Sequence, residues 1–223
     1  MQVKTRKRFL MKKIEKKELP YERVLFFSDA VVAIAITLLA LDLKIDIPAG
    51  QPFNFTDLIR PWHKYLAFVL SFINILGFWN THHQLFTYIK KMDGRLIWYN
   101  HAWLFFIVVL PFSTSILSDH ITDTAAVFCY SLNIFLISIL QNFLWDYSVL
   151  DRKGFIDPED IDEEHQKRYQ VMFNLDMLNG LVSVIVCFFA PLTAFILLFF
   201  KIPLLIFASF YIASKRRKEK KKR

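Results

Sequence analysis

Long apolar segments recur along the chain, and they constrain the fold more than any other feature. A membrane-spanning helix needs about twenty mostly apolar residues to cross a hydrocarbon core of roughly 30 Å. The apolar segments of this chain run from about 24–45, 65–88, 96–116, 124–147 and 172–214, and the last is long enough for two helices. With 55% hydrophobic residues the chain is too apolar for a soluble domain of its size. We therefore expect an all-α membrane protein with six transmembrane helices.

The division of the last apolar region, 172–214, leaves two possibilities open. Ala190-Pro191 is the favoured turn between two helices, because proline cannot continue a helix that precedes it. That division puts Lys201 near the middle of the sixth helix, where a charge is expensive unless it is paired or hydrated. The competing turn, at Lys201-Ile202-Pro203, leaves a short sixth span that continues into the basic tail. Both divisions predict six spans.

Basic residues concentrate at the two ends of the chain, in the segments 1–22 and 215–223. Clusters of this kind beside apolar segments are typical of cytoplasmic anchors that interact with anionic lipid headgroups. The formal net charge of +8 does not indicate a nucleic-acid partner, because the basic residues are not interleaved with stacking aromatic residues. We expect two cytoplasmic basic segments, 1–22 and 215–223, on either side of a six-span membrane domain, 23–214.

The charges of the connecting loops agree with this topology. The cytoplasmic side would have one short loop with Lys90, Lys91 and Arg95. It would also have a longer loop with Arg152, Lys153, Lys167 and Arg168, whereas the connection at 118–120 has no Lys or Arg. The positive-inside bias then predicts a multi-pass protein of the cell membrane with both termini in the cytoplasm. Tryptophans near the predicted span ends are expected at the membrane interfaces: Trp62, Trp98, Trp103 and Trp145.

Polar residues inside the apolar spans are candidate functional groups, because each is costly in a membrane unless it is paired or hydrated. The first span opens with Arg23, Ser28 and Asp29, and Arg23 lies too far from Asp29 for a favourable pairing along one helix. We expect these groups to bond to other helices. Candidate partners are Trp79, Asn80, His82, His83, Asn100 and His101. Adjacent histidines point about 100° apart on a helix, which argues against a metal site.

One face of the first span carries a second pattern. At 100° per residue, Ile34, Thr37, Leu38 and Leu41 fall within roughly one 100° sector, and Asp42 lies near its edge. Periodicity alone favours an ordinary helix-packing stripe at these positions.

The run Arg23-x-x-x-Phe27-Ser28-Asp29, at the start of a first membrane helix after a basic segment, resembles the signature of the transmembrane protein 175 family of potassium channels. The run Phe78-Trp79-x-x-His82-His83 at the end of the second span fits the same family, as do the proline in the third span and the total of six spans. A chain with one six-helix unit resembles the prokaryotic members, which assemble as homotetramers.

This resemblance implies a non-canonical tetrameric cation channel whose pore is lined by the first helix, without a Thr-Val-Gly-Tyr-Gly filter. It implies a hydrophobic constriction at Ile34 with wider apolar layers at Leu38 and Leu41, a selectivity role for the hydroxyl of Thr37, and Asp42 at the pore mouth. The motif residues would anchor the pore helix, through a network of Arg23, Phe27, Ser28, Asp29, Trp79, His82 and His83.

We therefore expect a potassium-selective, leak-type channel that needs no cofactor other than the permeant ion, contacts membrane lipids and binds no nucleic acid. No span carries Arg or Lys at every third residue, so voltage sensing is not expected. A proton- or cation-coupled transporter that uses Asp29, Asp176 and the histidines is the alternative, although no inverted repeat is visible. A membrane enzyme is not supported, because no nucleophile and base have the required spacing.

Overall fold

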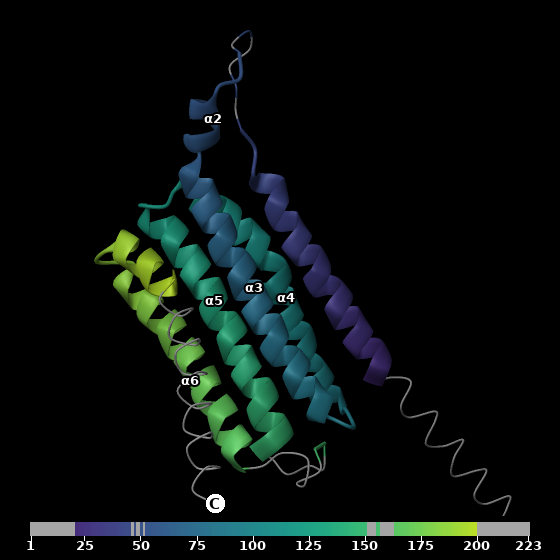
Figure 1. Ribbon diagram of the computed structural model, residues 1–223. Coiled ribbons are helices and arrows are strands. Elements are labelled where there is room, and N and C mark those ends of the chain that lie inside the picture. The colour runs from purple at the N-terminus through teal and green to yellow at the C-terminus, as the bar shows by residue number, and fades with distance from the viewer. Residues whose placement is uncertain are drawn as a thin grey trace, which may run out of the picture.

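The computed structural model describes residues 21–45, 47, 50, 52–150, 155–156 and 163–199, and most of them are helical. The N-terminal helix spans Tyr21–Asp42 and tightens at its end into a 3-10 turn, η1 (Leu39–Asp42). The next elements are α2 (Phe55–Ile59), α3 (Trp62–Tyr88), α4 (Gly94–Asp119), α5 (Thr124–Trp145), the π-helical turn η2 (Asp146–Leu150) and α6 (Glu163–Val186) (Figure 1). A further helical stretch covers 191–199.

The helices pack in a row in which sequence neighbours lie side by side. α4 packs against both α3 and α5, and α5 packs against α6. Short connections at 89–93 and 120–123 make these neighbours antiparallel, as expected for a helical bundle. The N-terminal helix stands at one side of the bundle, against α3 and α4, and α6 lies on the other side (Figure 1).

Four of the described helices are long and apolar enough to cross a membrane: Tyr21–Asp42, Gly94–Asp119, Thr124–Val149 and Gln166–Val186. α3 is not among them, although it has 27 residues, because polar side chains such as Asn74, Asn80 and His82 lower its mean hydropathy. The prediction of an all-α protein with several apolar spans is therefore confirmed.

One predicted boundary is wrong. The sequence placed Lys167 and Arg168 in a loop before a span that begins near residue 172, whereas α6 begins at Glu163 and contains both. A helix is not limited to the hydrocarbon thickness, so its charged first turns extend beyond the apolar part. Hydropathy marks where a membrane begins, and hydrogen bonding decides where the helix begins.

The favoured break before Pro191 is present. α6 ends at Val186, residues 187–189 form a turn, and the helical stretch begins at Pro191, where the missing amide hydrogen costs nothing. The Ala194 amide donates to the Ala190 carbonyl (3.0 Å), which starts the new helix. Lys201 and the two terminal basic segments lie outside the described residues, apart from 21 and 22.

The tryptophans divide into two groups. Trp62 and Trp98 are exposed, by 55% and 74%, as interfacial residues should be. Trp103 and Trp145 are fully buried, so the expectation that they lie at the interface is wrong. A position near the end of a span does not indicate which side of the helix a residue occupies. Both tryptophans lie on a side that faces a neighbouring helix. Trp145 donates from its indole Nε1 to Gln170 Oε1 on α6 (2.7 Å).

α4 is the helix that positions much of the candidate site. Asp93 precedes it, and the Asp93 side chain accepts a hydrogen bond from the Leu96 amide (2.9 Å), which satisfies one free donor of the first turn. Pro111 lies inside the helix, which continues past it. The hydroxyls of Ser113 and Thr114 donate to the Leu110 carbonyl one turn back, at 3.0 and 2.7 Å.

Candidate ion pathway and its anchoring network

The N-terminal helix has one buried face and one exposed face. Its buried face consists of small or aliphatic residues spaced by four, three and four: Ser28, Val32, Ala35 and Leu39, each at most 2% exposed. This spacing follows one stripe of an α-helix. The stripe packs against the rest of the subunit, whereas Ile34 and Leu41 on another face stay more than half exposed among the described residues.

The exposed face carries the residues that the sequence singled out. Ile34 is 59% exposed, Leu41 63% and Leu38 39%, and Thr37 is exposed beside them. The 3-10 turn η1 changes the direction of the side chains at the end of this helix, because side chains three residues apart eclipse in a 3-10 turn. Leu41 is thereby brought toward the line of Leu38 and Ile34. Asp42, the last residue of the helix, is partly exposed.

Thr37 is already bonded on its donor side. Its hydroxyl donates to the Ile34 carbonyl one turn earlier (2.8 Å). A hydroxyl oxygen that has donated its proton keeps two lone pairs that can accept. On an exposed face of a membrane helix, these lone pairs can contact water or a cation.

Two residues of the opening motif bond to the neighbouring helices. The Trp79 indole Nε1 on α3 donates to Asp29 Oδ1 (2.9 Å), and the Asn100 amide on α4 donates to Ser28 Oγ (2.9 Å). Ser28 in turn donates to the Val24 carbonyl (2.8 Å). The cytoplasmic half of the N-terminal helix, in the predicted topology, is thus joined to both α3 and α4.

His82 continues this network into the core. It is fully buried, and its Nε2 lies 2.8 Å from Asn100 Oδ1, so Nε2 is the protonated nitrogen that donates. Its ring stacks on Trp103, with centroids 4.3 Å apart, and on Phe86, at 4.2 Å. One directed chain of hydrogen bonds therefore runs from His82 through Asn100 to Ser28.

The remaining predicted residues have different surroundings. His83 is partly exposed and stacks on Trp79, with ring centroids 5.3 Å apart. Phe27 is 55% exposed and contacts His101 edge-on. Arg23, Phe27 and His101 line an open groove along the outside of the subunit. Thus Ser28 and Asp29 bond within the chain, while Arg23 and Phe27 face outward.

Sequence reasoning missed two contributors to the network. Tyr21, the first described residue of the helix, donates its hydroxyl to the Phe86 carbonyl at the end of α3. Trp103 supports His82 by stacking, although its position near a span end had placed it at the interface. Spacing could have found Trp103, since it lies three residues after Asn100 on the same face of α4.

Among the described residues, no group of three His, Cys, Asp or Glu side chains converges to hold a metal ion. Asp29 is instead bonded to the Trp79 indole, and His82 to the Asn100 amide. One face of the N-terminal helix is therefore bonded to α3 and α4. Another face is apolar and exposed, and it carries the hydroxyl of Thr37.

Comparison with known proteins agrees with this architecture. A family model described as endosomal/lysosomal potassium channel TMEM175 matches residues 23–111. A protein of Streptomyces collinus named as a potassium channel is 32% identical over 176 residues, which cover 77% of this chain and 84% of that protein. The chicken endosomal/lysosomal proton channel TMEM175 is 32% identical over 149 residues, which cover 61% of this chain and 30% of that protein.

A solved structure extends the likeness to the fold. The crystal structure of a lysosomal potassium-selective channel TMEM175 homolog from Chamaesiphon minutus superposes with a TM-score of 0.70 and 25% sequence identity. The match covers 87% of this chain and 99% of the solved chain.

Proposed function

The chain belongs to the TMEM175 family, and we propose on this basis that it is a potassium channel whose pore is lined by the N-terminal helices of four copies. The observation that carries the proposal is the exposed face of Ile34, Leu38 and Leu41, opposite the stripe that anchors the helix. Four such faces around one axis would enclose a narrow apolar conduit. The relatives named as potassium channels support the choice of ion.

Ile34 forms the constriction in this proposal. A ring of four exposed aliphatic side chains excludes water at small radius and closes a pore by dewetting. Opening requires these side chains to part or rotate with their helices. Leu38 and Leu41 continue the apolar wall toward the far end of the helix, where the 3-10 turn aligns them.

Thr37 supplies the polar layer next to the constriction. With its proton donated to the Ile34 carbonyl, its oxygen presents lone pairs to the conduit and replaces part of the hydration shell of a cation. Potassium loses water more easily than sodium, so a partial polar ring favours it. Asp42 at the pore mouth raises the local cation concentration.

The anchoring network holds this helix in place. The bonds from Trp79 to Asp29 and from Asn100 to Ser28 fix the height and rotation of the helix relative to α3 and α4. Arg23, Phe27 and His83 complete the motif at the surface between copies. Rotation of the pore face would therefore require these bonds to rearrange.

The wider assignment is a six-span channel domain, 23–214, in the cell membrane, with cytoplasmic basic segments at 1–22 and 215–223, and with K⁺ in place of any cofactor. Lipids and three further copies of the chain are the partners. Among the described spans, none has Arg or Lys at every third residue, which supports a leak-type channel without voltage sensing.

The identity of the permeant cation is the point at which the relatives differ. The vertebrate relatives are named as proton channels, and the bacterial ones as potassium channels. The second candidate function is therefore a pathway that carries protons instead of K⁺, either alone or coupled to another cation.

A planar-bilayer recording of the purified full chain separates these functions. With K⁺ on one side and Na⁺ on the other at equal pH, unitary currents that reverse near the potassium equilibrium potential are expected. In Ile34→Asn, a polar constriction should stay wet, so the conductance rises by about tenfold or more and the reversal potential moves toward zero. A reversal potential that follows a pH gradient, or saturable flux without unitary currents, contradicts the potassium channel.

A further inference from the structure

A small cavity lies at the end of the subunit where the N-terminal helix, α2, α3 and α4 meet, away from the anchoring network. Its volume is about 240 Å³. Six ionisable side chains from three parts of the sequence line it: Lys44, Asp57, Arg60, His63, Lys64 and Asp119. The proposed pore does not use any of them.

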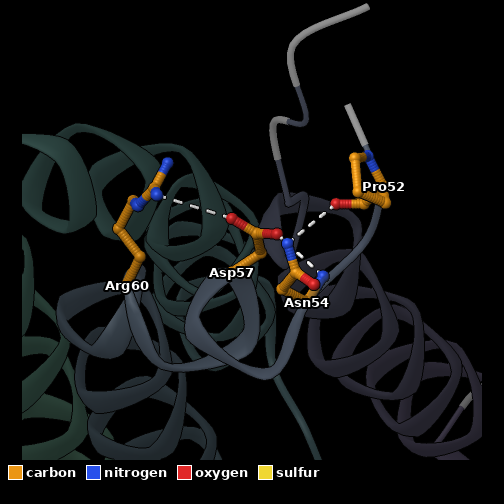
Figure 2. A network of polar contacts seen from close by, with 4 residues as sticks. All are labelled: Pro52, Asn54, Asp57 and Arg60. Atoms are coloured by element: carbon orange, nitrogen blue, oxygen red, sulfur yellow. Dashed lines mark hydrogen bonds and ion pairs between the residues drawn. The ribbon is translucent and has the colours of Figure 1, made fainter. Parts of the chain in front are cut away.

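The two acids of this cavity already have partners. Asp57 is buried, and one of its oxygens accepts from the Asn54 backbone amide (2.9 Å) while the other pairs with Arg60 (3.5 Å) (Figure 2). Figure 2 shows the Asp57 carboxylate between these two groups, with the Asn54 side chain turned to the Pro52 carbonyl. Asp119 pairs with Lys64 at 3.3 Å.

The basic side chains retain binding capacity. Lys44 has no acidic partner among the described residues and is exposed on the cavity wall. The Arg60 side chain is 69% exposed, and one nitrogen of its guanidinium group pairs with Asp57. His63 donates from Nδ1 to the Ser118 carbonyl (2.6 Å), and its Nε2 has no hydrogen-bond partner among the described residues. Three permanent cations face two carboxylates, so the cavity has an excess of positive charge.

The size and chemistry of the cavity fit one small anion. Its volume is smaller than the roughly 300 Å³ at which drug-sized pockets begin. A guanidinium together with ammonium groups is the arrangement that proteins use for phosphate oxygens.

The surroundings indicate where a phosphate would come from. Exposed apolar residues lie on α2 and the start of α3 at spacings of three, one and three: Phe55, Leu58, Ile59 and Trp62, which are 86%, 39%, 69% and 55% exposed. Exposed apolar side chains of this kind are typical of segments that lie in the headgroup region of a bilayer. Asp57, Arg60 and Lys64 follow the opposite stripe, toward the cavity.

We propose that this cavity binds a phosphate group, supplied by a phospholipid headgroup or by free phosphate, through Lys44 and Arg60, with Lys64, which is paired to Asp119, beside them. Lys44 lies two residues after the N-terminal helix, while Arg60 and Lys64 belong to the α2–α3 segment. A bound phosphate therefore ties the end of the N-terminal helix to the bundle. Binding itself does not depend on the proposed pore, so it can be tested without current recording.

The test compares lipid and phosphate binding by the full chain. Native mass spectrometry counts phosphatidylglycerol retained by protein from nanodiscs that contain phosphatidylglycerol and phosphatidylcholine, and titration calorimetry with inorganic phosphate tests the free anion. Lys44→Gln and Arg60→Gln should each lower the affinity at least fivefold, with an unchanged melting temperature. Lys44→Arg, which keeps the charge, should restore binding.

Lys91→Gln is the matched control, because Lys91 is exposed and lies beyond the other end of α3. It should leave both measurements unchanged. Retained lipid without calorimetric phosphate binding identifies a headgroup site, and the reverse identifies a site for free phosphate; both support the proposal. Binding that is equal in the wild type and in Lys44→Gln with Arg60→Gln overturns it.

Discussion

The N-terminal helix and α5 show opposite relations between apolarity and burial. The most apolar 18-residue window of the N-terminal helix is 22% buried, whereas the corresponding window of Thr124–Val149 is 56% buried. Yet the mean hydropathy of the N-terminal helix is the higher of the two. In a membrane, burying an apolar side chain against a protein gains little over burying it against lipid, so apolarity does not indicate the core.

Polar contacts cross the apolar interior of the bundle. Tyr130 on α5 accepts hydrogen bonds from Ser71 (3.0 Å) and Asn74 (3.3 Å) on α3, and Thr114 Oγ1 on α4 lies 2.7 Å from Ser71 Oγ. All four side chains are buried. The comparison indicates that polar residues of α5 specify packing, while the N-terminal helix keeps exposed apolar residues, which line the pore in the proposed channel. Four substitutions test this division.

The largest effect on stability is expected at the buried stripe of the N-terminal helix. Leu39→Ala removes a side chain that is 1% exposed and should cost about 3 kcal/mol of unfolding free energy, because it leaves a cavity against the bundle. The measurement is unfolding by SDS titration from mixed micelles. Leu38→Ala, one residue earlier on the exposed face, should cost less than about 1 kcal/mol. Equal losses would show that the two faces are not distinct.

Asn100→Leu is expected to cost about 2 kcal/mol, because it leaves the buried His82 Nε2–H and Ser28 Oγ without the partners they have now. The same titration measures it. Asn80→Leu is the control, since Asn80 is exposed and accepts a hydrogen bond from Gln84 one turn away (3.2 Å). If Asn100→Leu is as stable as Asn80→Leu, the network does not anchor the helix.

Gly180→Ala tests the contact between α5 and α6. A methyl group at Gly180 would lie 2.9 Å from Phe135 Cα and 3.1 Å from its Cβ, so the two helices must move apart. We expect a loss of roughly 1–2 kcal/mol, read as a lower melting temperature in detergent. Gly77→Ala meets no atom within 4 Å and should be neutral or slightly stabilising. The opposite order of the two variants would contradict the close packing.

The smallest effect in energy is expected at Thr37, and it appears in selectivity rather than in stability. Thr37→Val keeps the shape but removes the hydroxyl oxygen, so the preference for K⁺ over Na⁺ should fall about three- to fivefold, less than 1 kcal/mol. Bi-ionic reversal potentials measure it. Thr37→Ser keeps the hydroxyl and should retain the preference. An unchanged reversal potential in Thr37→Val would remove Thr37 from the proposed selectivity layer.

Much of the fold could be predicted because membrane helices obey simple length and hydropathy rules. The starts of α3, α4 and α5 lie within three residues of the predicted spans. The start of α6 could not be predicted in the same way, because Lys167 and Arg168 are polar yet helical. The burial of Trp103 and Trp145 could not be predicted for a related reason, because position along a span does not reveal which neighbour a side chain contacts.

The sequence could name candidate residues but not the hydrogen bonds that they make. The motif and the projection of the first span singled out Ile34, Thr37, Ser28 and Asp29. Only the packed bundle decided that Trp79 bonds to Asp29 and that Asn100 joins His82 to Ser28. The cavity at Lys44 had no signal in the sequence, because its lining residues come from three separate segments.

The sequence by itself determined that the chain crosses a membrane several times as helices, because in lipid every backbone group must bond within its own segment. It also determined one stripe of apolar residues and a hydroxyl on the first helix. Only the tertiary structure decided which faces are buried, since lipid and protein interior are equally apolar and hydropathy cannot tell them apart. Directional hydrogen bonds between α3, α4 and the N-terminal helix made that choice, and they leave Ile34, Thr37, Leu38 and Leu41 facing outward.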